Sequence, residues 1–313
     1  KRQLYCRANL DKVSLVMKPT LFLNVGTGWS GTTPLYYTLG WYNKYCHSGH
    51  RKEKGYLWLM DLSETRNTFE RVKFYKQFFG PSKQSTTNRK PKIFTHESKY
   101  IGGNWTPEEI NYFWSPPFTI EKYIEYYIKH WDFIKHDYKA VSDFSNPNGQ
   151  CSPEFLRKYA PALKSVFDVK IHVVFRDPLR RLWSLRQKQN PKDPVRQFMK
   201  MGVDFGYVQF FLKFVEAFGL ENCHMTIMEE FWNGETKELS DFIDYEIKEV
   251  HPNAYVPDLG PNAPRIQYLD DQWESDIMHM PKEVKEYGLN MLKPVYIHFK
   301  DYFGDLPEQW SKL

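Results

Sequence analysis

The feature that most constrains the fold is an apolar strand that runs directly into a glycine-rich turn and then a helix, in "LFLNVGTGWSGTTPLYYTL". The glycines Gly26, Gly28 and Gly31 let the backbone curl, so that successive N–H groups can converge on one point. Pro34 suits the first turn of the helix, where its missing N–H costs nothing. The segment therefore predicts an anion cradle at a helix N-terminus, with a purely structural turn as the alternative.

The rest of the chain alternates between strand-like and helix-like patterns. Five short β-rich apolar runs are predicted as strands, at residues 21–25, 93–95, 139–142, 171–175 and 224–228. Helical spacing of apolar residues occurs at 121–130, 153–159, 179–187, 207–218 and 282–303. This order predicts an α/β fold, in which a central, mostly parallel sheet of about five strands is covered by helices on both faces.

One domain is expected for all 313 residues, because no Gly/Ser-rich or charged linker interrupts them. The segment at about 50–114 departs from the alternating pattern, with the polar run "PSKQSTTNRKPK", many aromatic residues and little periodicity. We interpret it as an insertion that shapes a pocket for a second substrate, or alternatively as a surface elaboration.

Bulk composition excludes several classes of protein. Lys and Arg number 43 against 38 Asp and Glu, a net charge of +5 that is too small and too dispersed for a nucleic-acid binder. The four cysteines are widely spaced and form no CxxC pair, so we expect free thiols and no structural metal. No apolar run approaches the ~20 residues that span a bilayer. A soluble, cytoplasmic protein is favoured unless a leader or anchor has been removed.

A second candidate anion site lies in "VKIHVVFRDPLRRLWSLR". A buried strand ends at Arg176, Asp177 follows as the expected helix N-cap, and Pro178 takes the first helical position. Ser184 lies two turns further along the same helix. A guanidinium at the strand end and this hydroxyl can grip one phosphate from two directions, although a surface ion pair and an exposed serine would give the same pattern.

Together the two segments resemble the family of sulfotransferases that use 3′-phosphoadenosine 5′-phosphosulfate (PAPS). "GTGWSGTT" is similar to that family's 5′-phosphosulfate loop and "FRDPLRRLWS" to its 3′-phosphate motif. "GLENCHMTIMEEFWNGETKELSDFIDY" and "LKPVYIHFKDYFGDLPEQW" resemble its later segments. The resemblance implies a P-loop, nucleotide-kinase-like three-layer fold. The donor-binding residues that it implies are Gly28, Trp29, Ser30, Gly31, Thr32, Thr33, Arg176 and Ser184.

The catalytic base is predicted from the carbohydrate (heparan-sulfate-like) branch, which the sequence resembles most. There a Glu at a strand end, about thirty residues before the Arg, removes the acceptor's proton. "YKAVSDFSNPNG" occupies that place and offers Asp143, with Asp in place of Glu and one additional residue, Asn146. A loop-capping Asp is the alternative. His96 and Glu97 are the second choice, because cytosolic relatives use a histidine, although one much closer to the Arg.

Positive charge near the leaving phosphate is expected from Lys52, in "RKEKGYLW", which resembles the family's Lys-Glu segment. Many relatives carry Lys or Arg where this loop has Trp29, so the cation must come from elsewhere. An ordinary solvated lysine is the alternative for Lys52.

The predicted function is sulfuryl transfer from PAPS to a hydroxyl or amine of a sugar, glycan or small metabolite, with no metal. A phosphotransferase that uses ATP and magnesium is the first alternative, but such enzymes carry Lys where this chain has Thr32. A PAPS-binding protein without catalysis is the second. Acceptor identity, oligomeric state and compartment stay open.

Overall fold

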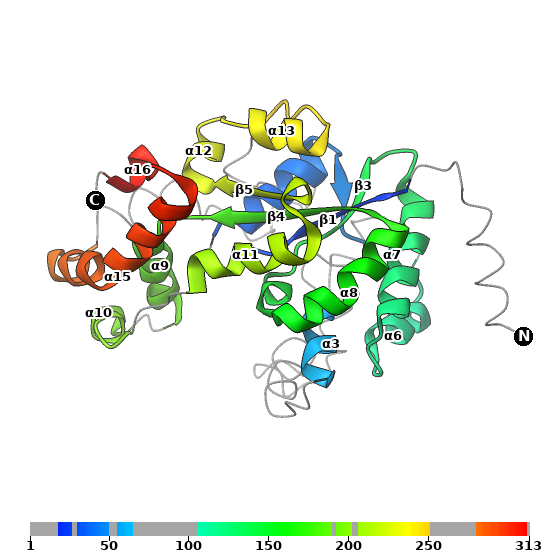
Figure 1. Ribbon diagram of the computed structural model, residues 1–313, viewed down its shortest axis with the longest axis horizontal. Coiled ribbons are helices and arrows are strands. Elements are labelled where there is room, and N and C mark those ends of the chain that lie inside the picture. The colour runs from blue at the N-terminus through cyan, green and yellow to red at the C-terminus, as the bar shows by residue number, and fades with distance from the viewer. Residues whose placement is uncertain are drawn as a thin grey trace, which may run out of the picture.

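The computed structural model describes residues 18–26, 30–49, 55–64, 105–189, 192–201, 206–250 and 280–311. Within these residues a five-stranded sheet has the order β2-β3-β1-β4-β5, and every neighbouring pair of strands is parallel. Helices lie on both faces of this sheet (Figure 1). The predicted α/β fold with a central parallel sheet of about five strands is therefore confirmed.

Four of the five predicted strands are present. The observed strands are β1 (Thr20–Asn24), β2 (Cys46–His47), β3 (Ala140–Asp143), β4 (Asp168–Phe175) and β5 (Cys223–Ile227). The predicted strand at 93–95 lies outside the described residues. Strand β2 was not predicted, because two residues are too few for a periodic pattern. It forms only through its pairing with β3, in which Cys46 faces Ala140.

The sheet is buried because its strands carry apolar side chains toward both faces. In β1, Leu21 and Leu23 point into one hydrophobic core, whereas the intervening Phe22 points into another. In β4, Val173 and Val174 divide between the same two cores. Since successive strand residues alternate between faces, this division produces three layers.

The five helices predicted from periodicity are all present. Those of three or more turns are α7 (Ile120–Ile134), α8 (Pro153–Val166), α9 (Pro178–Gln189), α11 (Gly206–Phe218) and α15 (Lys282–Phe303). Shorter helices are α2 (Thr32–Tyr36), α3 (Tyr56–Glu64), α6 (Pro107–Trp114), α10 (Pro194–Phe198), α12 (Met228–Trp232), α13 (Lys237–Ile243) and α16 (Glu308–Ser311). Thr119 and Ser152 cap α7 and α8 through their side chains, as expected for helix N-caps.

The described ends of the 50–114 segment belong to the larger core. Tyr56 of α3 and Trp114 of α6 are 1% and 4% exposed, and their rings meet edge to face at 5.0 Å. Tyr56 also contacts Phe118 at 5.1 Å. The segment thus starts and ends against the sheet-covering helices, while its proposed role in a substrate pocket concerns residues outside those described.

Three of the four cysteines lie within the described residues. Cys46, Cys151 and Cys223 are free and buried, as predicted, and Cys6 lies outside the described part. Burial raises the pKa of both Cys46 and Cys223 to about 12, so these thiols stay protonated at neutral pH.

None of the helices in the described ranges is both long and apolar enough to cross a bilayer.

Gly149 supplies a test of how tightly the loop after β3 packs. It lies in the 3₁₀ turn η3 (Asn146–Gln150), and a Cβ there would lie 1.8 Å from Phe210 Cζ and 2.4 Å from the Val25 carbonyl oxygen. Because the carbonyl belongs to the backbone, Gly149→Ala should lower the free energy of unfolding by roughly 3 kcal/mol, measured by urea denaturation. Gly234→Ala is the control, since nothing lies within 4 Å of its Cβ position and only its φ of +91° is unfavourable. We expect it to cost roughly 1 kcal/mol; equal losses would contradict the packing described.

Candidate functional site

The glycine-rich turn begins directly against the neighbouring strand. A Cβ on Gly26 would lie 3.0 Å from Thr32 Cγ2 and 3.6 Å from the backbone nitrogen of Val174 in β4. Gly31 has φ +85°, and a Cβ there would lie 2.0 Å from Met228 Sδ. Gly31 therefore requires glycine for both space and backbone conformation, whereas a Cβ at Gly26 would fit only if the Thr32 methyl group moved slightly.

The structure describes only part of the predicted donor loop. Ser30 and Thr32 are buried, and Thr32 starts α2. Gly28 and Trp29 lie outside the described residues, as does the side chain of Thr33, so their predicted contacts with the donor stay predictions.

A buried polar chain connects the start of the turn with the centre of the sheet. Asn24 Oδ1 accepts a long hydrogen bond of 3.5 Å from the Gly26 N–H, and Asn24 Nδ2 donates to His172 Nδ1 at 2.8 Å. His172 Nε2 lies 2.8 Å from Thr226 Oγ1. Because the amide nitrogen is a donor, His172 carries its proton on Nε2, and burial lowers the pKa of His172 well below its usual value. A neutral histidine thus links β1, β4 and β5 beneath the turn.

Arg176 follows the last residue of β4 and is 7% exposed. Strands β1 and β4 are parallel neighbours, with Asn24 opposite His172. The glycine-rich turn and Arg176 therefore lie at the same edge of the sheet, where ligands of open α/β sheets bind. Ser184, half-buried, lies on α9.

Asp177 caps α9 as the sequence predicted, through a 2.8 Å hydrogen bond from the Arg180 N–H to its Oδ1. The structure adds two partners that the sequence did not indicate. The Asp177 N–H donates to Glu229 Oε1 at 3.1 Å, and the Tyr296 hydroxyl of α15 lies 3.3 Å from both carboxylate oxygens. Glu229 reads in the sequence as an ordinary helical acid, and only its packing reveals this contact.

Asp143 occupies the carboxyl end of β3, on the other side of β1, and has no exposed surface. Its Oδ2 accepts hydrogen bonds of 3.0 Å from both the Tyr123 hydroxyl and Asn148 Nδ2, and its Oδ1 accepts one from the Ser145 hydroxyl. Burial, followed by the charge of Asp143, raises the pKa of Tyr123 well above its usual value, which keeps this hydroxyl a donor. A substrate would reach the carboxylate only after one of these side chains moves.

The same network holds the beginning of α3. Ser145 Oγ accepts the Gly55 N–H at 2.9 Å, and Asn148 Oδ1 accepts the Trp58 N–H at 3.3 Å. The chain that enters α3 is therefore tied to the end of β3. Lys52, His96 and Glu97 lie outside the described residues, so their predicted roles stay predictions.

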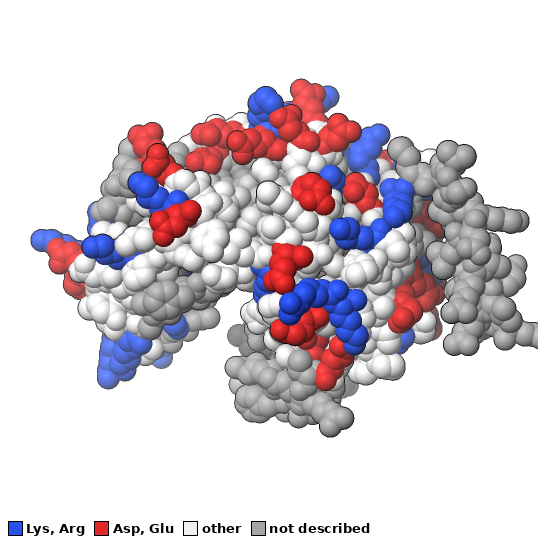
Figure 2. Space-filling view, viewed as in Figure 1, with Lys and Arg blue, Asp and Glu red and all other residues white. Residues whose placement is uncertain are grey.

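The molecular surface is hollowed along one side (Figure 2). The hollow separates the part built from α9, α10 and α15 from the part built from α3 and α8 (Figure 2). In the same view β4 points toward α9 and α15, on one side of this hollow (Figure 1).

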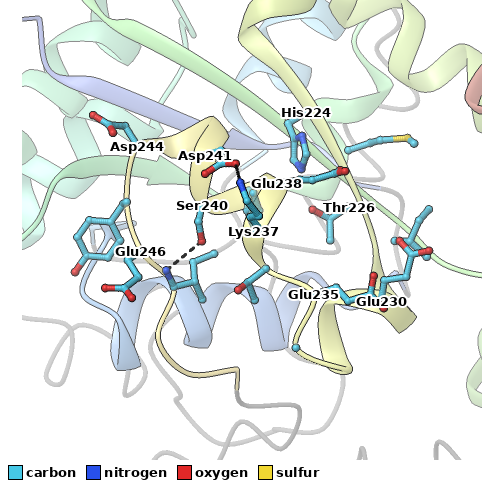
Figure 3. A pocket seen from close by; sticks show the side chains of 17 residues that line it. His224, Thr226, Glu230, Glu235, Lys237, Glu238, Ser240, Asp241, Asp244 and Glu246 are labelled. Atoms are coloured by element: carbon cyan, nitrogen blue, oxygen red, sulfur yellow. Dashed lines mark hydrogen bonds and ion pairs between the residues drawn. The ribbon is translucent and has the colours of Figure 1, made fainter.

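A pocket of about 1130 Å³ lies elsewhere, along the edge strand β5 and helices α12 and α13. Figure 3 shows its lining, in which Lys237 is paired with Asp241. The other charged side chains that line it are all acidic, namely Glu230, Glu235, Glu238, Asp244 and Glu246. Burial, reinforced by neighbouring carboxylates, raises the pKa of Glu230. Acidic side chains also crowd the surface over α12 and α13 (Figure 2), so this pocket would repel a bisphosphorylated nucleotide.

Within the described ranges, no group of three or more His, Cys, Asp and Glu side chains is arranged to hold a metal ion.

No protein-family model and no curated protein matches the sequence. A sulfotransferase from Alicyclobacillus acidocaldarius is similar in structure, with 13% identity, 95% of this chain and 100% of that chain covered, and a TM-score of 0.49. The sulfotransferase domain from the curacin biosynthetic pathway is 15% identical, with coverage of 90% and 98% and a TM-score of 0.48. The sulfotransferase domain from the olefin synthase of Synechococcus PCC 7002 is 12% identical, with coverage of 95% and 99% and a TM-score of 0.43. At these identities the similarity concerns the fold.

The environment of Asp177 predicts a pH-dependent stability. Burial raises the pKa of Asp177 to about 7, the charge of Glu229 acts in the same direction, and the hydrogen bond from the Arg180 N–H opposes them. The folded protein therefore holds a proton that the unfolded chain has already released, and stability falls as the pH rises toward 7. Asp177→Asn resembles the protonated acid at every pH. We expect its free energy of unfolding to rise relative to wild type by about 1–3 kcal/mol between about pH 5 and pH 8. The free energies of unfolding are measured by urea denaturation at each pH. If those of wild type and Asp177→Asn changed with pH in parallel, the raised pKa of Asp177 would be contradicted.

Proposed function

We propose that this protein transfers a sulfuryl group from PAPS to an acceptor hydroxyl or amine. The 5′-phosphosulfate would lie on the turn that begins at Gly26, and the 3′-phosphate on Arg176 and Ser184. The observation that carries the proposal is the close approach of Gly26 to Val174, two residues before Arg176, across the parallel pair β1 and β4. Two sequence motifs typical of one bisphosphorylated nucleotide thereby share one edge of the sheet.

An ATP-dependent phosphotransferase is the less favourable alternative. Its loop needs a lysine that reaches the β- and γ-phosphates beside magnesium. Thr32 holds that position here and is 4% exposed at the start of α2. The backbone N–H groups and the helix end still favour an anion, but without the side-chain charge that a triphosphate requires.

The proposed reaction is an in-line displacement at sulfur. The acceptor oxygen or nitrogen forms a bond to sulfur while the bond between sulfur and the bridging phosphate oxygen breaks, and adenosine 3′,5′-bisphosphate leaves. The acceptor's proton passes to a base, and positive charge offsets the charge on the departing phosphate. Lys52 is proposed for that charge.

Asp143 is proposed as the base, with His96 and Glu97 as the second choice. Asp143 lies at the end of β3, next to β1, and this position supports the proposal. The pairing of Leu23 with Asp143 sets the distance between Asp143 and the glycine-rich turn. A sugar, a glycan or a small metabolite is the proposed acceptor, in keeping with the carbohydrate-like position of Asp143 in the sequence.

The nucleotide assignment can be tested by calorimetry. Wild-type protein should bind adenosine 3′,5′-bisphosphate without magnesium and at least about tenfold more tightly than adenosine 5′-monophosphate, because Arg176 adds a charge-assisted contact. Arg176→Ala should remove that preference and leave binding of the monophosphate nearly unchanged. Arg157→Ala is the control, because that side chain forms exposed ion pairs with Glu154 and Glu216 on α8 and α11. Tight binding of ATP with magnesium, but none of the bisphosphate, would overturn the proposal.

The base is tested by transfer of labelled sulfate from PAPS. We expect Asp143→Asn to lower kcat by about 10²-fold or more, since general-base catalysis contributes about that much. Asp61→Asn is the control, because Asp61 is also a buried carboxylate and accepts hydrogen bonds from the Ser152 backbone and hydroxyl at 2.7 and 3.1 Å. If both variants lose activity in proportion to lost stability, Asp143 is not the base.

A further inference from the structure

The turn that carries Arg176 is held from outside its own segment. Strands β4 and β5 are paired up to Phe175 and Ile227, and Glu229 follows two residues after that pair. From there its Oε1 accepts the backbone N–H of Asp177 at 3.1 Å. The peptide bond that this N–H belongs to is the one joining Arg176 to Asp177.

This hydrogen bond fixes how the chain leaves β4. The N–H of a helix N-cap has no partner in the helix that it starts, and a buried N–H without an acceptor is costly. Asp177 is 0% exposed, so the Glu229 carboxylate replaces water as the acceptor. It thereby fixes the plane of the peptide on which the direction of the Arg176 side chain depends.

A second contact holds the same turn from the opposite side. The Tyr296 hydroxyl of α15 lies 3.3 Å from both carboxylate oxygens of Asp177, whose Oδ1 also caps α9. Charged groups next to this turn are Arg176 at the end of β4, Arg180 on α9 and Glu229 on α12. The turn is therefore held by both α12 and α15. We call the contacts of Glu229 and Tyr296 with Asp177 the clamp.

The clamp has features that a simple helix cap does not need. Glu229 is 3% exposed, and its Oε2 has no hydrogen-bond partner among the described residues. Burying Glu229 beside the acid Asp177 costs free energy of folding, because either the like charges repel or one of the two groups must keep its proton, whereas a neutral residue would accept the same N–H. A costly arrangement that fixes the direction of one arginine is better explained by ligand binding than by stability.

We propose that Glu229 and Tyr296 are positioning residues for Arg176 and thereby determine the preference for adenosine nucleotides that carry a 3′-phosphate. The inference rests on the proposed function, because it assigns the 3′-phosphate to Arg176. Neither residue needs to touch the nucleotide. Both act through the backbone and side chain of Asp177.

The experiment compares two nucleotides on the same set of variants. Calorimetry with adenosine 3′,5′-bisphosphate and with adenosine 5′-monophosphate gives an affinity ratio that a general loss of stability would not change. Glu229→Ala should lower the affinity for the bisphosphate about tenfold, equivalent to about 1.4 kcal/mol, with little effect on the monophosphate. Glu229→Gln should restore most of the ratio, because its amide oxygen can still accept the Asp177 N–H.

Tyr296→Phe removes only the hydroxyl and should lower the ratio by a smaller factor. Glu230→Ala is the matched control, since the neighbouring Glu230 faces the acidic pocket and should leave the ratio unchanged. If Glu229→Ala does not fold, Tyr296→Phe provides the test. A loss of affinity for the bisphosphate alone supports the proposal, and an unchanged affinity ratio overturns it. Equal weakening of both nucleotides also overturns it. A wild-type protein that does not prefer the bisphosphate would instead overturn the proposed function.

Discussion

The parallel pairing of β1 with β4 is the constraint on which the candidate site depends. It sets Asn24 opposite His172 and carries Gly26 against the backbone of Val174. Two motifs that are predicted to bind anions, about 150 positions apart in the chain, thus reach one edge of the sheet. The chain Asn24–His172–Thr226 strengthens this register, because each of its buried polar groups is satisfied only while the three strands stay aligned.

Buried carboxylates recur at this edge, one after each of three strands. Asp143 ends β3, Asp177 follows β4 and Glu229 follows β5. Asp143 accepts hydrogen bonds from three side chains, whereas Asp177 and Glu229 each accept a backbone N–H of the turn after β4. Under the proposed function, an anionic ligand at this edge would be met by the start of α2 and by Arg176 rather than by these carboxyl groups.

The sequence predicted the fold better than it predicted the supports of the site. Residues 171–175 and the Asp177 cap carry strong local signals, a run of apolar residues and an Asp-Pro pair, and both predictions are confirmed. Strand β2 has no such signal, because its two residues become a strand only beside β3. Glu229 and Tyr296 were missed for a similar reason, since their patterns match any amphipathic helix.

Local order along the chain was therefore determined by the sequence itself, including the strand, turn and helix that begin at β1 and the arginine at the end of β4. Periodicity, glycine and capping residues act over a few positions and can be recognised without the rest of the protein. Only the tertiary structure decided that Asp143 is enclosed by three hydrogen-bond donors and that Glu229 holds the Asp177 N–H. The contacts of Tyr123 with Asp143 and of Glu229 with Asp177 join residues 20 and 52 positions apart, whereas Ser145 and Asn148 are local neighbours of Asp143. The distant contacts arise from the packing of helices on a sheet, which no local pattern specifies.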